Sequence, residues 1–199
     1  MHRLFVALDL PAPVTDEIAA ICHGLNGMRW VSPDNLHLTL RFIGEVPPSV
    51  TLEVEEALAE IDAAAFSFAL VGIGHFESAG RPRAVWLGVE ADPGLAKLRK
   101  KIDRRLRAVG VKLDHHDFRP HVTLGRTRGV PGADLASYMA DHGLFRSPPI
   151  MASEFHLFRS HLSPDGAHYT RQASYGLSGG WSEHFDDCLL YTSPSPRDS

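Results

Sequence analysis

The chain repeats one order of expected elements, and this repetition limits the folds open to it. Several segments carry apolar residues at the spacing of an amphipathic helix, and β-rich runs lie between them. The helical segments are residues 14–25, 50–61 and 95–109, with a weaker one over 131–142. The β-rich runs are residues 3–9, 36–45, 66–76, 84–90, 120–127, 150–160 and 167–177. Because the second half of this order roughly repeats the first, we expect a duplicated α+β unit.

We expect the duplicated unit to form one bilobal domain. Two mainly antiparallel sheets, flanked by helices, would face each other across a central cleft. No linker separates the halves cleanly, so we interpret residues 1–178 as a single domain. Residues 179–199 begin at a pair of glycines and lack periodicity, which is typical of a non-structural tail. Within this tail, residues 188–199 resemble the translation of a sequencing adaptor.

The composition excludes several classes of protein. The 199 residues are 44% hydrophobic and 22% charged, which is enough to bury a core. A formal net charge of −4 argues against coating of nucleic acid by bulk electrostatics. No run is long enough for a membrane span, and the N-terminus resembles a strand rather than a signal peptide, so we expect a cytoplasmic protein. Cys22 and Cys188 alone are too few for a disulfide framework.

Two short strings repeat each other and are the strongest indication of function. His-Leu-Thr-Leu begins at His37, and His-Val-Thr-Leu begins at His121. Both are typical of strands, in which residues i and i+2 share a face. His37 therefore lies on the same face as Thr39, and His121 on the same face as Thr123. Each string presents one imidazole and one hydroxyl.

Two imidazoles that converge on one point can divide acid and base catalysis between them. A neutral ring accepts a proton from water while a protonated ring donates one to a leaving oxygen, and both forms exist near neutral pH. The two hydroxyls, those of Thr39 and Thr123, can donate hydrogen bonds to phosphate oxygens as charge builds up on them. The pattern therefore indicates phosphodiester chemistry that needs no metal and no cofactor.

In this context the two strings resemble the motifs of the two-histidine (2H) phosphoesterases, and in particular the bacterial RNA 2′,3′-cyclic phosphodiesterases, also called 2′-5′ RNA ligases. Further segments fit the same pattern: Arg3–Ala7, Asn35–Val46, Gly74–Phe76, Arg81–Val89, Arg119–Arg126 and Leu157–Ser160. The resemblance implies hydrolysis of an RNA or nucleoside 2′,3′-cyclic phosphate to the 2′-phosphate, with 2′-5′ ligation as the reverse reaction. It also implies that His37 is the proton donor and His121 the proton acceptor. We expect a monomer that acts on RNA or oligonucleotide ends.

Four further residues near the strings are candidates for substrate binding. Arg41 has the parity of His37, so it is expected on the same face, although a solvated arginine is an alternative. Arg126 has the opposite parity and needs a bulge to reach that face. Phe42 and Phe76 could stack on a base, although aromatic residues in strands are more often part of the core.

Other interpretations remain open at this stage. The substrate could be a small cyclic phosphate such as ADP-ribose 1″,2″-cyclic phosphate, or the chain could bind RNA or nucleotides without catalysis. We do not expect a metal site at His115 and His116, because neighbouring strand residues point to opposite faces and no further ligands complete a shell.

Overall fold

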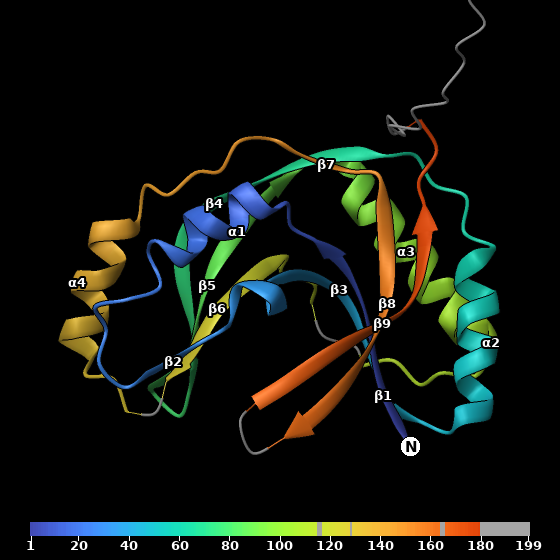
Figure 1. The fold of residues 1–199 in the computed structure, drawn as a ribbon, viewed down its shortest axis with the longest axis horizontal. Coiled ribbons are helices and arrows are strands. Elements are labelled where there is room, and N and C mark those ends of the chain that lie inside the picture. The colour runs from blue at the N-terminus through green and yellow to red at the C-terminus, as the bar shows by residue number, and fades with distance from the viewer. Residues whose placement is uncertain (115–116, 128, 164–165, 180–199) are drawn as a thin grey trace, which may run out of the picture.

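The structure, a computed structural model, describes most of the chain (Figure 1). The described residues are 1–114, 117–127, 129–163 and 166–179. His115, His116 and all but the first residue of the expected tail 179–199, including residues 188–199, lie outside the described residues.

Within the described residues, nine strands form one continuous sheet, and every named pair of strands is antiparallel. The strands are β1 (His2–Asp9), β2 (Met28–Trp30), β3 (His37–Val46), β4 (Phe66–Ser78), β5 (Arg81–Ala91), β6 (His121–Thr127), β7 (Ile150–Ala152), β8 (Glu154–Ser163) and β9 (Gly166–Gly176). Their order across the sheet is β7-β4-β5-β6-β3-β1-β8-β9, and β2 pairs with β6.

This order is symmetric about the boundary between β6 and β3. We call β3, β1, β8 and β9 the first half-sheet, and β6, β5, β4 and β7 the second half-sheet. The two expected sheets correspond to these half-sheets, which form one sheet because they join edge to edge at one residue pair, Leu38 with Val122. The duplicated α+β fold with antiparallel strands is confirmed.

The half-sheets do not coincide with the halves of the sequence. The run expected as one strand over 150–160 is divided at Ser153. Before that point β7 pairs with β4, and after it β8 pairs with β1. The hairpin of β8 and β9 thus returns to the N-terminal strand, which ties the two half-sheets together.

Four helices connect the strands of the described chain: α1 (Ala12–Ala19), α2 (Pro48–Ala59), α3 (Pro93–Ala108) and α4 (Gly132–His142). A short 3₁₀ helix, η1 (Pro33–Asn35), precedes β3. Proline at the start of α1, α2 and α3 suits the first helical turn, where no N–H donor is needed. The carboxylate of Asp92 also caps α3 by accepting a hydrogen bond of 2.6 Å from the N–H of Gly94.

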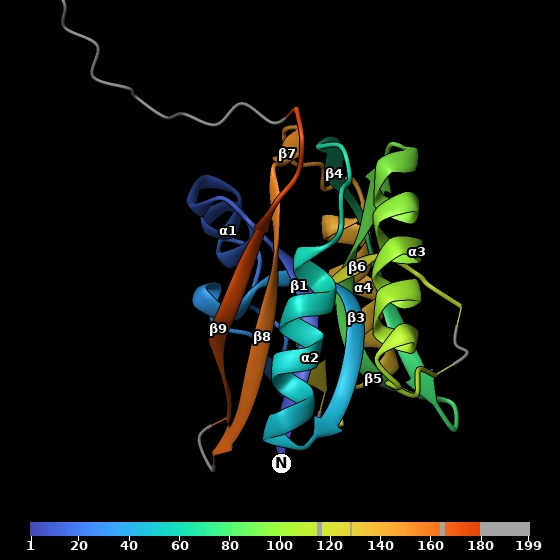
Figure 2. The same ribbon diagram turned by 90° about the vertical axis from the view of Figure 1, so that its right-hand side faces the viewer.

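Helices α2 and α3 lie side by side over one face of the sheet, whereas α1 lies on the other side (Figure 2). We call the face toward α3 the helix face. Leu38, Leu40 and Val122 are 0–1% exposed, as are Leu98 and Ile102 of α3. Each such side chain contributes about 1.5–3 kcal/mol by its removal from water. This apolar layer therefore fixes which side of β3 and of β6, the strands of the two histidine strings, faces α3.

Helix α1 is shorter than its apolar spacing predicts, because it ends at Ala19 rather than near residue 25. The N–H groups of Ile21 and Cys22 bond to carbonyls three residues earlier, at 3.1 and 3.2 Å, which tightens the chain into a turn. Gly24 then adopts a φ of +75°, a value that ends helical geometry.

No helix within the described residues combines the length and apolar character needed to cross a membrane.

Candidate active site

A β-bulge follows the first histidine string. In the pairing of β1 with β3, Thr39 lies opposite Ala7 and Arg41 lies opposite Val6, so Leu40 is an extra residue. An extra residue shifts the alternation of the strand by one position. Consequently Leu40 and Arg41 both turn toward the helix face, where both are buried.

The second string carries the same bulge at the same position. In the pairing of β5 with β6, Thr123 lies opposite Trp86 and Gly125 lies opposite Val85, so Leu124 is the extra residue. The two motif strands therefore share their backbone irregularity as well as their sequence pattern.

The bulge corrects the expectation for Arg41, which was that it shares the face of His37. Arg41 is 8% exposed, and its guanidinium donates to both carboxylate oxygens of Asp103 in α3, at 2.7 and 2.9 Å. It also donates to the carbonyl of Asp114 at 3.1 Å. Arg41 therefore neither lies on the face of His37 nor is solvated. Its side chain links β3 to α3 instead.

The bulge also decides where Phe42 and Arg126 lie. Each comes two residues after the extra residue of its bulge, and it points to the face that carries the histidines. We call this face the histidine face. Phe42 is 66% exposed, and its ring centroid is 6.0 Å from that of Phe5. Arg126 is exposed as well. The bulge that Arg126 needs to reach this face is present at Leu124.

The single pair between the half-sheets brings the two strings together. With Leu38 opposite Val122 in an antiparallel register, His37 comes opposite Thr123, and Thr39 comes opposite His121. Directly opposite residues of such a pair have Cβ atoms about 4.5–5.5 Å apart. The two imidazoles and the two hydroxyls thus form one two-fold arrangement at the centre of the sheet.

Both imidazoles are braced in the same way. Nδ1 of His37 lies 2.7 Å from the carbonyl oxygen of Asn35, and Nδ1 of His121 lies 2.7 Å from that of Arg119. Because a carbonyl only accepts hydrogen bonds, each Nδ1 must carry the proton. Nε2 of each ring is left to exchange a proton with a ligand, since no hydrogen bond to it occurs within the described residues.

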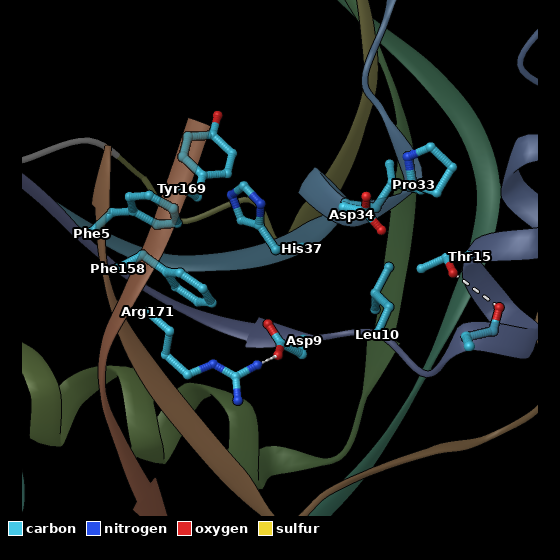
Figure 3. A pocket seen from close by; sticks show the side chains of 12 residues that line it. Phe5, Asp9, Leu10, Thr15, Pro33, Asp34, His37, Phe158, Tyr169 and Arg171 are labelled. Atoms are coloured by element: carbon cyan, nitrogen blue, oxygen red, sulfur yellow. Dashed lines mark hydrogen bonds and ion pairs between the residues drawn. The ribbon is translucent and has the colours of Figure 1, made fainter. Parts of the chain in front are cut away.

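Aromatic rings hold His37 in place (Figure 3). Its ring centroid is 4.9 Å from that of Phe5 and 5.2 Å from that of Tyr169, which meets it edge to face at 88°. Phe158 lies beneath, with a centroid separation of 6.4 Å. These neighbours come from β1, β9 and β8, so the returning hairpin completes this half of the site.

Aromatic rings also surround His121. Phe76 meets it nearly perpendicular with a centroid distance of 4.9 Å, and Trp86 lies 6.1 Å away. Trp86 in turn lies across Gly74, where a Cβ atom would come within 2.3 Å of the indole. Phe76, a candidate for base stacking, is therefore in contact with a candidate catalytic ring.

A pocket of about 260 Å³ adjoins His37 and is lined by residues from β1, α1, η1, β8 and β9. Burial lowers the pKa of His37, and the nearby charge of His121 lowers it further. The hydrogen bond to Asn35 and the carboxylate of Asp9 act in the opposite direction. Asp9 also lines the pocket, where it is paired with Arg171 (Figure 3).

Phe5, Asp9 and the residues of β9 that surround His37 are functional candidates that the sequence motifs do not predict. Their link to the motif is strand pairing: Asp9 is the partner of His37 between β1 and β3. The alternation of β1 predicts which face Phe5 lies on, but the sequence does not show that β1 pairs with β3, the strand of His37. No cluster of three or more His, Cys, Asp or Glu side chains suited to a metal ion occurs among the described residues.

This duplicated fold with its paired histidines defines the class of two-histidine phosphoesterases, and comparison with known proteins agrees. The sequence profile of the family described as LigT-like phosphoesterase matches the chain twice, over residues 8–86 and 87–169. The chain belongs to this family. The double match is consistent with the duplication and covers both histidine strings, one in each match.

Two curated relatives illustrate the similarity. An RNA 2′,3′-cyclic phosphodiesterase of Archaeoglobus fulgidus is 32% identical over 170 residues, which is 84% of this chain and 96% of that protein. One of Aeropyrum pernix is 36% identical and covers 75% and 86% of the two chains. Among solved structures, LigT of E. coli complexed with 3′-AMP superposes with a TM-score of 0.71 at 28% identity, over 89% of this chain and 98% of that one.

Proposed function

We propose that this phosphoesterase hydrolyses 2′,3′-cyclic phosphates at RNA or oligonucleotide ends to 2′-phosphates by metal-independent acid and base catalysis. The observation that carries the proposal is the two-fold placement of His37 and His121 about the Leu38–Val122 pair, each with Nδ1 held by a carbonyl and Nε2 without a partner in the described chain. The relatives named RNA 2′,3′-cyclic phosphodiesterase support the choice of substrate.

In the proposed reaction, Nε2 of His121 takes a proton from water as the water oxygen forms a bond to phosphorus. The bond between phosphorus and the 3′ oxygen breaks, and that oxygen receives the proton of His37 Nε2. One positioned acid or base contributes about 10²- to 10⁴-fold to such a rate. Run backwards, with a 5′-hydroxyl in place of water, the same steps form a 2′-5′ link.

We assign the hydroxyls of Thr39 and Thr123 to the non-bridging phosphate oxygens. Neither hydroxyl has a hydrogen-bond partner within the described residues, and both lie on the histidine face. Donors that are already oriented toward the developing charge stabilise the transition state without reorganisation.

The neighbouring residues supply substrate contacts of two kinds. Arg126 is suited to a phosphate because its guanidinium is exposed on the histidine face. Phe42, exposed on the same face, is suited to stacking with a base. Phe76 contacts His121, so its proposed contribution to base binding is secondary to holding that ring.

We also propose that the protein acts as a monomer and in the cytoplasm. One chain supplies both histidines, both threonines and the pocket, which supports the monomer. The molar mass in solution, measured by light scattering, tests the oligomeric state. A dimer at working concentration would contradict a monomer.

The activity is tested with a short RNA that ends in a 2′,3′-cyclic phosphate, with and without EDTA. We expect a 2′-phosphate product and a rate that EDTA does not change. A 3′-phosphate product would contradict the assignment of the leaving oxygen, and loss of activity in EDTA would contradict the metal-independent mechanism. ADP-ribose 1″,2″-cyclic phosphate, tested in parallel, should react more slowly. Binding of the RNA without turnover would instead indicate a non-catalytic module.

A further inference from the structure

The two half-sites differ in the residue that stands beside each histidine on the neighbouring strand. His37 is paired with Asp9 of β1, and His121 is paired with Gly88 of β5. β1 and β5 occupy equivalent places in the two half-sheets. One imidazole therefore has a carboxylate beside it and the other has none at the equivalent position.

Steric exclusion explains why the second half-sheet lacks this group. A Cβ atom on Gly88 would come within 2.7 Å of the backbone carbonyl oxygen of Val71 in β4. A backbone atom cannot move aside as a flexible side chain can, so any larger residue at position 88 displaces the strand. The packing of β5 against β4 therefore excludes a carboxylate at position 88.

The carboxylate of Asp9 is held in place by the returning hairpin. The guanidinium of Arg171 in β9 donates to Asp9 Oδ2 (Figure 3). Nε2 of His156 in β8 lies 3.6 Å from the same oxygen. His156 is 1% exposed, and its Nδ1 is 2.9 Å from the hydroxyl of Ser174. Asp9 is 39% exposed on the side toward the pocket, so its charge is only partly screened.

We propose that Asp9 is a positioning residue that favours the protonated form of His37 against the burial of that ring, so that His37 can donate its proton. This inference rests on the proposed function, in which one histidine must donate a proton and the other must accept one. A carboxylate beside an imidazole stabilises the imidazolium, and His121 has a glycine where His37 has this carboxylate. The difference between Asp9 and Gly88 thereby divides the roles of two otherwise matched histidines.

The other charges around His37 do not replace Asp9. Arg171 of β9 is a cation, the charge of His121 in β6 acts against protonation of His37, and Tyr169 of β9 contacts His37 through its ring. Asp34 of η1 lines the pocket at a position exposed to solvent, which screens its charge. Burial already lowers the pKa of His37, and Asp9 is the carboxylate that opposes this effect.

The test compares Asp9→Asn with Glu45→Gln. Glu45 is a matched control because it is an exposed carboxylate on the same pair of strands, opposite Arg3 at the far end from the site. We expect Asp9→Asn to move the NMR titration of the His37 ring to lower pH and to reduce kcat/KM about tenfold on the alkaline side of its pH profile. Glu45→Gln should leave both unchanged.

Two further variants separate charge from damage to the fold. Asp9→Glu retains the carboxylate and should restore most of the alkaline activity. Arg171→Gln removes the cation that neutralises Asp9, so we expect His37 to titrate at higher pH, opposite to Asp9→Asn. A shift to lower pH in Arg171→Gln, or a wild-type His37 titration in Asp9→Asn, would overturn the proposal. Because the titration needs no substrate, it gives an answer even if the cyclic phosphate is not hydrolysed.

Discussion

The two half-sites match in their backbone and differ in what they offer a ligand. Each has a His-x-Thr string, a bulge three residues after the histidine, and an imidazole braced by a carbonyl two residues earlier. Beyond the bulge, the first strand presents Phe42 on the histidine face and the second presents Arg126. The duplication thus retains the groups that act on a phosphate, while a ring on one side and a cation on the other make the site directional.

The largest effect is expected where the half-sites are alike. His37→Ala and His121→Ala should each lower kcat by about 10²-fold or more, because each removes one of two coupled proton transfers. The double variant should be little worse than either single one, since groups that act as a unit are not additive. Rates on an RNA 2′,3′-cyclic phosphate, with circular dichroism as the check on folding, measure this. Near-wild-type turnover by either variant would refute the paired mechanism.

The threonines test whether the two-fold arrangement extends to the phosphate. Thr39→Val and Thr123→Val should each lower kcat about 10- to 100-fold, because a hydrogen bond to a charged group contributes about 1.5–3 kcal/mol. Valine keeps the shape and the strand preference, so the melting temperature should hardly change. Unchanged kcat in both variants would show that the hydroxyls do not meet the developing charge.

Replacing the two arginines that follow the strings, Arg126 and Arg41, should affect different quantities: substrate binding for Arg126 and stability for Arg41. Arg126→Ala should raise KM about tenfold with unchanged stability, because its exposed guanidinium would lose a phosphate contact worth about 1.4 kcal/mol. Arg41→Ala should leave KM unchanged and lower the free energy of unfolding by roughly 2–3 kcal/mol. That is below the loss for a fully buried pair, because Arg99 and Arg107 remain within 3.4 and 3.9 Å of Asp103. Urea denaturation and steady-state kinetics on both variants make the comparison, and a raised KM in Arg41→Ala would contradict the structural role.

These arginines also show how far local sequence patterns reach. The histidines and threonines of the strings, and the α+β class, follow from alternation and helical spacing, which depend on neighbours in the chain. The position of Arg41 depends on a bulge, and a bulge is defined only against a partner strand. Likewise, the division of residues 150–160 at Ser153 and the approach of Asp9 to His37 depend on which strands pair. Pairing between distant segments does not appear in the periodicity of either segment.

A variant of Phe42 tests whether the ring of the first half-site binds a base while Arg126 of the second half-site binds a phosphate. Phe42→Ala should raise KM by several-fold, because stacking of one base contributes about 1–3 kcal/mol and part of this is offset by ordering the substrate. Since the ring is 66% exposed, the loss of stability should be small. The effect should depend on the base next to the cyclic phosphate, whereas that of Arg126→Ala should not. Kinetics on the four nucleoside 2′,3′-cyclic phosphates distinguish the two, and equal dependence on the base would remove the distinction.

The smallest effect concerns the histidine buried behind the first half-site. Burial lowers the pKa of His156, although the carboxylates of Asp9 and Glu154 act against this. The folded state therefore favours the neutral ring, so stability is full above the unfolded-state pKa of about 6.5 and is lost as pH falls below it. His156→Gln should make the free energy of unfolding less dependent on pH between 7 and 5, by at most about 1.4 kcal/mol per pH unit. Urea denaturation at both pH values measures this, and an unchanged slope would mean that His156 takes up its proton equally in the folded and unfolded chain.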